Sequence, residues 1–215
     1  MTTRLFQGDC MDSLKEIGDK SVDVLFADAP YIPPEHSKTL TRYKKTLSEM
    51  AILECFYKNY LKEIDRVLKD DGRIYLFANS DSYALFYLHL YQYVKKIRCF
   101  VWDKIMCSLG YTFRHQHELI LYAERPNAKP IKTGTGDIFK FRAVKAKGKS
   151  HPAEKPVDLL KHILQNHKNE TILDTFMGTG SIGVACKELG LNYIGMELEP
   201  EYYEVAKSRI GLTEL

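Results

Sequence analysis

The sequence predicts an α/β fold with a doubly wound, mostly parallel sheet, and three observations support this prediction. Residues 171–197 alternate an apolar strand, a glycine-containing turn, a helix and a second strand, which is typical of a nucleotide-binding βαβ unit. Residues 22–27 form an apolar run of the kind that is buried on both faces of a parallel sheet. The 215 residues suit one domain with a sizeable core. We therefore expect a single domain over residues 1–215.

Apolar periodicity and turn residues predict the other elements. Strands are expected at 4–7, 73–77, 97–104 and 116–123, the last two as an antiparallel pair, and a short strand around Phe139 and Phe141. Helices are expected from 10 to about 16, from a Ser48 cap to about 68, from a Ser80 cap to about 95, after Pro156, and from 200 to about 210. Residues 32–47 show no periodicity and are predicted to form a mobile loop.

The order of the elements indicates a circular permutation. A nucleotide-binding unit normally opens a doubly wound domain, yet here it comes last, and a strand that ends at Asp28 lies near the N-terminus. Permutation is tolerated because the two termini of a domain usually lie close together on its surface. The loop that begins at Asp28 and the glycine-containing turn of the nucleotide-binding unit are still expected at the carboxyl ends of neighbouring strands. This is where open α/β sheets bind ligands.

Composition argues against membrane, disulfide-rich and zinc-knuckle proteins. No apolar run reaches membrane-spanning length, and the N-terminus has no signal-peptide pattern. The five cysteines include no C-x-x-C pair. Net charge is +3, but residues 125–151 hold eight Lys or Arg and one Asp, so the rest of the chain is net acidic. We expect a soluble, cytoplasmic protein with one surface that faces a polyanion.

The glycine-containing turn narrows the choice of ligand. Gly178 and Gly180 allow the backbone to approach a ligand closely, and Glu197 at the end of the next strand can bind two ribose hydroxyls. The spacing Gly178-x-Gly180-x-x-Gly183 formally matches the dinucleotide fingerprint, but this match alone is weak. Asp174 would repel a pyrophosphate, whereas it can pair with the ammonium of an amino-acid-bearing nucleoside. S-adenosylmethionine therefore fits better than a dinucleotide.

Four motifs carry a family resemblance. Asp28-Ala29-Pro30-Tyr31 resembles the D-P-P-Y motif of amino-group DNA methyltransferases, and residues 174–181 resemble their cofactor motif, D-P-F-x-G-S/T-G-T. Residues 151–156 are similar to the H-P-T/A-x-K-P box, and Trp102-x-Lys104 with His117-Glu118 is similar to the strand-pair region between the two halves. Because the catalytic motif precedes the cofactor motif, the chain resembles the permuted β group. The resemblance implies a Rossmann-like, S-adenosylmethionine-dependent methyltransferase fold.

The resemblance also implies catalytic roles for residues 28–31. An exocyclic amino nitrogen is a poor nucleophile because its lone pair is delocalised into the ring, so it must be held in line with the sulfonium methyl group. Asp28 would accept one N–H of the target amino group, and the Ala29 carbonyl would accept the other. Pro30 would stiffen the turn, and Tyr31 would stack on an extruded base. Ala29 replaces the usual proline, which puts the rate in question more than the reaction type.

By the same resemblance, the cofactor-binding residues are Asp9, Cys10, Asp174, Phe176, Gly178, Gly180, Glu197 and Lys155. Asp9 with the Cys10 backbone would hold the adenine ring, although an aspartate that begins a surface helix is a competing interpretation. Lys155 would order the methionine end, although it could also lie at the start of a helix without contacting the ligand. His115 and His117 point the same way along a strand but have no third ligand, so no metal is expected.

Two basic segments flank the predicted catalytic pocket and favour binding to double-stranded DNA. They supply the predicted DNA contacts Lys38, Arg42, Lys44, Lys45, Lys140, Arg142, Lys145 and Lys147. Such residues neutralise phosphates and give affinity without sequence information. Residues 125–150 are a candidate target-recognition region, and their short length favours a short recognition sequence or help from a second subunit in a homodimer.

Together these features predict a DNA methyltransferase that forms N6-methyladenine at a specific sequence, in a prokaryotic cell or a cell infected by a prokaryotic virus. Asp at position 28, rather than Ser or Thr, resembles the adenine-N6 subset more than most cytosine-N4 enzymes. The alternatives are cytosine-N4 methylation, RNA methylation, a catalytically silent DNA-binding module and a dinucleotide-dependent oxidoreductase.

Overall fold

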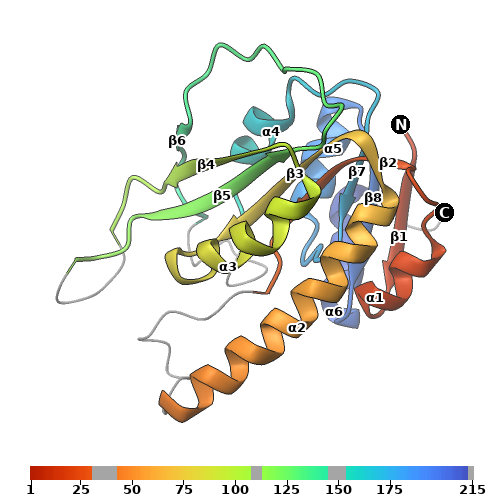
Figure 1. The fold of residues 1–215 in the computed structure, drawn as a ribbon. Helices are drawn as coiled ribbons and strands as arrows, with labels where there is room; N and C mark the ends of the chain where they lie inside the picture. The colour runs from red at the N-terminus through yellow and green to blue at the C-terminus, as the bar shows by residue number, and fades with distance from the viewer. Residues whose placement is uncertain (31–42, 108–112, 145–153, 213–215) are drawn as a thin grey trace.

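The protein forms three layers, with a central sheet covered by helices on both faces (Figure 1). The computed structural model describes residues 1–30, 43–107, 113–144 and 154–212, without the side chains of residues 43–50 and 81. In these ranges no helix is long and apolar enough to cross a membrane.

The strands within the described ranges form one mixed sheet in the order β1-β8-β7-β2-β3-β5-β4-β6. They are β1 (Thr3–Gln7), β2 (Val22–Ala27), β3 (Leu68–Ala78), β4 (Lys96–Asp103), β5 (His117–Glu124), β6 (Ile138–Lys140), β7 (Thr171–Asp174) and β8 (Asn192–Glu197). Neighbouring strands are parallel except at β5, which runs antiparallel to both β3 and β4. The predicted mostly parallel sheet with an antiparallel pair is confirmed.

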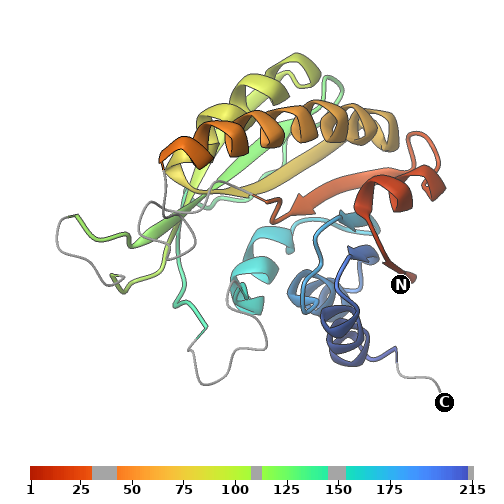
Figure 2. The same cartoon turned by 90° about the horizontal axis from the view of Figure 1, so that it is seen from below.

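The helices divide between the two faces of the sheet (Figure 2). They are α1 (Cys10–Ser13), α2 (Tyr43–Val67), α3 (Ser80–Leu90), α4 (Val157–Leu164), α5 (Ser181–Leu189) and α6 (Pro200–Ile210), with 3-10 turns at Leu14–Glu16 and Tyr91–Tyr93. Helices α2 and α3 lie on one face, and α4, α5 and α6 lie on the other. The chain is therefore doubly wound, as predicted.

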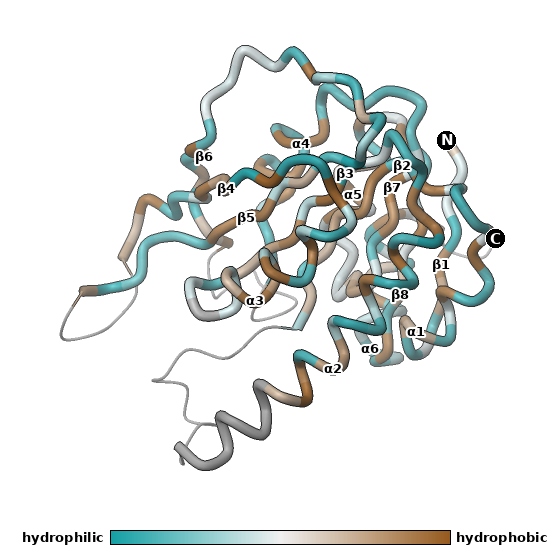
Figure 3. Tube along the Cα trace, viewed as in Figure 1, coloured by the Kyte–Doolittle hydropathy of each residue, from teal (hydrophilic) through white to brown (hydrophobic). Residues whose placement is uncertain are grey.

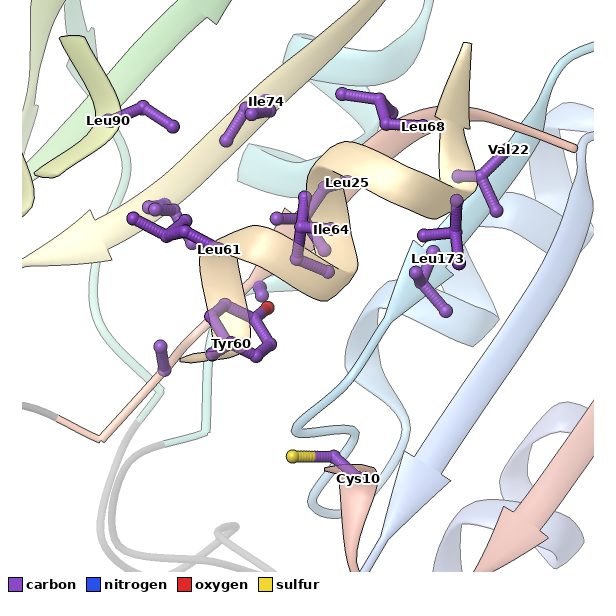
Figure 4. Close-up of a cluster of buried hydrophobic side chains, with 14 of the residues drawn as sticks. Cys10, Val22, Leu25, Tyr60, Leu61, Ile64, Leu68, Ile74, Leu90 and Leu173 are labelled. Carbon is purple, nitrogen blue, oxygen red and sulfur yellow. The ribbon is translucent and has the colours of Figure 1, made fainter. Parts of the chain in front are cut away.

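Two apolar clusters fill the space between the layers. Side chains of β2 alternate between them, because Leu25 packs into the cluster under α2 whereas Val24 and Phe26 pack into the cluster under α4 and α5. Figure 4 shows Leu61 and Ile64 of α2 directed toward the sheet in the first cluster. Apolar residues are concentrated along the central strands in Figure 3. Burial of β2 on both faces explains why its sequence is apolar except at Asp23, which is half-buried and pairs with Lys69.

Two helix starts differ from the prediction. Helix α2 begins at Tyr43 and not at a Ser48 cap, so Lys44 and Lys45 belong to the helix and not to a loop. Lysine and leucine propagate a helix well, and their propensity outweighs the capping signal of the serine. Helix α3 is capped by Asn79, whose side chain accepts a hydrogen bond from the Ser82 N–H at 2.9 Å. It also ends earlier than predicted, at Leu90.

Strand β3 begins earlier than predicted, at Leu68, so that Asp70-Asp71-Gly72 lies inside the strand. The pairing with β2 shifts at this point, because Val22 lies opposite Leu68 while Val24 lies opposite Arg73. The turn-forming residues therefore mark a bulge within a continuous strand and not a connection between a helix and a strand.

Candidate active site

Four segments that are distant in sequence meet at one edge of the sheet. Strands β1, β8, β7 and β2 are successive parallel neighbours, so their carboxyl ends lie along the same edge. These ends lead to Asp9, Glu197, Asp174 and Asp28, respectively. The arrangement agrees with the permuted order, in which the two ligand loops still lie side by side.

Two cavities of about 320 Å³ each open at this edge. The apolar cavity is lined by side chains that include Asp9, Cys10, Ile52, Leu53, Phe56 and Leu198. The second cavity is the more polar of the two and is called the polar cavity below. It is lined by residues that include Asp28, Glu154, Lys155, Gly178, Thr179 and Ser181. Pro30, Phe176 and Glu197 line both cavities, so the two are adjacent and share a wall, with an apolar end and a more polar end.

The aromatic rings of Phe56 and Phe176 line the apolar cavity. The ring of Phe176 lies 6.3 Å from that of Phe56 and 5.7 Å from that of Tyr60, measured between centroids. The Tyr60 hydroxyl is fixed by a buried hydrogen bond of 2.7 Å with Thr175 Oγ1. Rings held in this way offer a flat apolar surface to another ring.

Asp9 and Cys10 line the apolar cavity. The Asp9 carboxylate caps α1 by accepting a hydrogen bond from the Met11 N–H at 2.7 Å. The residue therefore begins a helix and lines the cavity at the same time. Burial raises the pKa of the Cys10 thiol to about 12, so the thiol stays protonated and is unsuited to nucleophilic chemistry.

The carboxylate of Glu197 is held at the junction of the two cavities. One oxygen accepts a hydrogen bond from the Gly178 N–H at 2.7 Å, and the other accepts one from the Glu199 N–H at 2.9 Å. These bonds orient the carboxylate where the apolar and polar ends of the site meet.

The two predicted cofactor glycines have different surroundings. Gly178 has φ +54°, lines the polar cavity, and has no atom within 4 Å of the position that a Cβ would occupy. A Cβ on Gly180, at φ +82°, would lie 2.9 Å from the Ala206 Cβ of α6. Gly178 therefore leaves space for a ligand, whereas Gly180 allows close packing of α5 against α6.

Asp174 lies behind the site and not on its surface. The residue is 0% exposed, and its carboxyl group accepts hydrogen bonds from the Tyr193 hydroxyl and the Phe176 N–H. Burial raises the pKa of Asp174 to about 8, so the carboxyl group is mostly neutral at pH 7. It holds the turn at Phe176 in place, and the predicted pairing with a ligand ammonium has no structural support.

Lys155 has a different set of contacts from those that the sequence suggested. Its ammonium lies 2.7 Å from Oδ2 of Asp28 and 3.1 Å from Oε2 of Glu118, and the residue is 5% exposed. The backbone at Ala29 is tightly packed, since this residue is 0% exposed, while Pro30 is exposed at the cavities. Lys155 therefore contacts the predicted catalytic carboxylate of Asp28 directly.

Several predicted residues cannot be compared with the structure. Tyr31, Lys38, Arg42, Lys145, Lys147 and His151 lie outside the described residues, and the side chains of Lys44 and Lys45 are not described. Lys140 and Arg142 are described, and both are exposed. His115 and His117 are also exposed, and within the described ranges no group of three His, Cys, Asp or Glu side chains could hold a metal ion.

Two features of the structure have no counterpart in the sequence analysis. The first is the contact of Glu118 with Lys155, because Glu118 appeared only as part of a motif and nothing in its spacing indicates a partner 37 positions away. The second is a cavity of about 350 Å³ between β4, β5 and α4. Its lining includes Lys96 and Glu124 at the opposite edge of the sheet, so this cavity is separate from the candidate site.

A family comparison agrees with the geometry of this edge. The family model described as DNA methylase, N6_N4_Mtase, matches residues 22–208 and so includes both Asp28 and the βαβ unit. The protein belongs to this DNA methylase family. The family depends on S-adenosylmethionine. Family membership identifies the chain as a DNA methyltransferase and leaves no support for the oxidoreductase alternative.

Individual DNA methyltransferases resemble the chain over most of its length. The type II methyltransferase M.HinfI of Haemophilus influenzae is 30% identical over 242 residues, which cover 96% of this chain and 67% of that protein. M1.HpyAVI, solved in complex with S-adenosylmethionine, gives a TM-score of 0.72 at 22% identity and covers 98% of this chain and 100% of its own.

One further solved structure bears on the target base. The PvuII DNA methyltransferase, which is cytosine-N4-specific, gives a TM-score of 0.75 at 13% identity, covering 97% of this chain and 86% of its own. At such identities the likeness concerns the fold alone. The fold is therefore shared with a cytosine-N4-specific DNA methyltransferase, so the fold alone does not identify the amino group that this protein modifies.

Proposed function

We propose that this DNA methyltransferase transfers a methyl group from S-adenosylmethionine to the N6 amino group of adenine in duplex DNA. The observation that carries the proposal is the adjacency of the two cavities, which share Phe176 and Glu197 in their linings, with Asp28 on the wall of the polar one. Aspartate at position 28 favours adenine over cytosine as the target, by resemblance to the adenine-N6 enzymes.

The residues of the site fit the cofactor. The apolar cavity, with Phe56 and Phe176, suits an adenine ring, and Asp9 also lines it. Glu197, at the junction, is placed to bind the ribose hydroxyls. The open space beside Gly178 would hold the amino-acid end in the polar cavity. When bound, the cofactor supplies an electrophilic methyl group on a sulfonium sulfur.

Asp28 is the proposed catalytic residue. Its carboxylate would accept an N–H of the target amino group, and the Ala29 carbonyl would accept the second N–H, which directs the nitrogen lone pair toward the methyl carbon. Asp28 and the Ala29 carbonyl would thus hold the nitrogen in line with the methyl group, which the cofactor would supply while sulfur keeps the electron pair of the carbon–sulfur bond. The proton released by the methylated nitrogen would pass to the Asp28 carboxylate and from there to solvent. Tyr31 is proposed to stack on the extruded base.

The DNA is proposed to approach the edge that carries Asp28. Lys140 and Arg142 are exposed in and after β6, which pairs with β4 near the end of β4 at this edge. The connection from β4 to β5 also starts at this edge and exposes Met106 and Phe113. Cations of this kind bind phosphates, and apolar side chains can insert between base steps.

Mass spectrometry of digested nucleosides tests the target base. Unmodified duplex DNA is incubated with the protein and S-adenosylmethionine carrying a labelled methyl group. The proposal predicts labelled N6-methyladenine. Labelled N4-methylcytosine would overturn the base assignment but leave the reaction type, and label appearing only with an RNA substrate would overturn the assignment to DNA.

A further inference from the structure

Four charged side chains of alternating sign form a row beside the active site. The Lys155 ammonium lies 2.7 Å from Oδ2 of Asp28 and 3.1 Å from Oε2 of Glu118. The Lys104 ammonium lies 2.5 Å from Oε1 of the same glutamate. Asp28 follows β2, Glu118 lies in β5 and Lys104 follows β4, so the row crosses the carboxyl edge of the sheet.

Each of the two ammonium groups lies over an aromatic ring. Phe77 comes from β3, the strand between β2 and β5, and its ring centre lies 4.8 Å from the Lys155 ammonium. Trp102 of β4 lies in the same relation to Lys104, at 5.1 Å. Contacts with a ring and two carboxylates compensate a buried ammonium for the loss of its hydration. Removal of one charge from such a row changes the strength of the ion pairs between the remaining charges.

Glu118 competes with Asp28 for the same ammonium. Burial raises the pKa of Glu118, but the nearby ammonium groups of Lys155 and Lys104 outweigh burial and hold this pKa below its usual value. Glu118 is therefore ionised at neutral pH. Lys155 is shared between two carboxylates, of which only Asp28 lines the polar cavity together with it.

We propose that Glu118 and Lys104 are positioning residues that set how strongly Lys155 binds Asp28. This inference rests on the proposed function, in which Asp28 accepts an N–H of the target amino group. A carboxylate that pairs fully with an ammonium is a weaker acceptor, and one without an ammonium takes up a proton more readily. Glu118 draws Lys155 partly away from Asp28, and Lys104 limits this effect by neutralising Glu118.

Other titratable groups also face this row. Tyr57 of α2 and Asp174 of β7 interact electrostatically with Asp28. Glu154, next to Lys155 in the chain, forms an ion pair of 2.8 Å with Arg209 of α6. Substitutions at Glu118 and Lys104 leave all of these side chains in place, so a pair of variants at these two positions addresses the proposed coupling.

The two substitutions Glu118→Gln and Lys104→Met are expected to shift the titration of Asp28 in opposite directions. Without the Glu118 charge, Lys155 pairs more fully with Asp28, and the titration midpoint of Asp28 moves to lower pH. Without Lys104, Glu118 attracts Lys155 more strongly, and the midpoint moves to higher pH. Carbon-13 NMR of labelled aspartate carboxyl groups measures both titration midpoints. The signal that is missing from the spectrum of Asp28→Asn is the signal of Asp28. Glu188→Gln, which removes a carboxylate from an exposed ion pair with Lys161, is the matched control.

Methyl transfer provides the second readout. The single-turnover rate of Glu118→Gln is expected to fall by about 10-fold, as for a weakened hydrogen bond to a charged group, while the Kd for S-adenosylmethionine stays within about threefold of the wild-type value. A purely structural role would not give opposite titration shifts in the two variants. Unchanged midpoints in both variants would overturn the inference even if the wild type methylates adenine. Shifted midpoints in a protein that does not methylate DNA would instead overturn the proposed function alone.

Discussion

The Tyr193 hydroxyl donates a hydrogen bond of 2.9 Å to Oδ2 of Asp174 inside the core. Both residues are 0% exposed, and they belong to the neighbouring strands β8 and β7. The bond joins the two strands of the βαβ unit directly below the turn that carries Phe176 and Gly178. Asp174 thus supports this turn from behind, in a form that is mostly neutral at pH 7.

This burial makes the free energy of unfolding depend on pH. The pKa of Asp174 is about 8 in the folded protein, against an ordinary value of 3.8. The folded state therefore holds an extra proton, and its stabilising contribution is fully present below the ordinary pKa and is lost as pH rises through about 8. Asp174→Asn mimics the neutral form and removes this dependence.

Urea unfolding at pH 5.5 and pH 8.5 measures the effect. Between these two pH values, the wild type should lose about 3 kcal/mol more of its free energy of unfolding than Asp174→Asn does. Equal losses in the two proteins would show that Asp174 is ionised in the folded state.

Alanine substitutions at the two glycines of the turn should separate packing from ligand binding. Gly180→Ala should lower the free energy of unfolding by about 2–4 kcal/mol, because its Cβ would meet Ala206 and its φ is positive. Gly178→Ala should cost about 1 kcal/mol, from its positive φ, but should weaken cofactor binding more strongly. Denaturant unfolding and calorimetry with S-adenosylmethionine compare the two. If Gly180→Ala weakened binding without loss of stability, the division of roles would be wrong.

Removal of the Glu197 charge should affect binding more than turnover. Glu197→Gln is expected to raise the Kd for S-adenosylmethionine by about 10-fold to 100-fold, because a charged hydrogen-bond acceptor becomes neutral. The rate at saturating cofactor should change by less than about threefold. Calorimetry and single-turnover kinetics measure the two quantities. A large fall in rate with an unchanged Kd would place Glu197 in the chemical step.

Removal of two exposed cations should change the salt dependence of DNA binding. In the double variant Lys140→Ala, Arg142→Ala, the slope of log K against log salt should decrease in magnitude by about 1.8, as expected for two lost phosphate contacts. Lys168→Ala is the control, because Lys168 is exposed in the turn before β7 at the opposite edge. Fluorescence anisotropy over a range of salt concentrations gives the slopes. An equal decrease in the control would indicate a nonspecific charge effect.

Local sequence patterns were sufficient for the elements that depend on local interactions. The bounds of β2 agree with the prediction because its run is apolar except at Asp23. Helix α5 lies within the predicted βαβ unit and is followed by Gly190 in the left-handed conformation, a common signal for the end of a helix. The convergence of Asp28 with the βαβ unit also followed, since parallel strands place their carboxyl ends at one edge. The start of α2 was wrong because a serine within a helix gives the same signal as a cap.

Contacts between distant segments could not be predicted from the same patterns. The partners of Lys155 are Asp28, directly after β2, and Glu118 in β5, and no spacing in the sequence relates those positions. The burial of Asp174 depends on Tyr193, and the restriction at Gly180 depends on Ala206 of a different helix. A motif indicates that a residue matters, but only the packing shows whether it faces the ligand or the core.

Single-turnover methyl transfer by Asp28→Asn tests the central claim most directly. The variant is compared with the wild type on unmodified duplex DNA at saturating labelled S-adenosylmethionine, and cofactor binding is measured alongside by calorimetry. We expect the rate of N6-methyladenine formation to fall by about 10-fold to 100-fold, because a neutral amide replaces a charged acceptor, with the Kd for the cofactor within about threefold of the wild-type value. A variant that forms N6-methyladenine at the wild-type rate would contradict the catalytic role of Asp28.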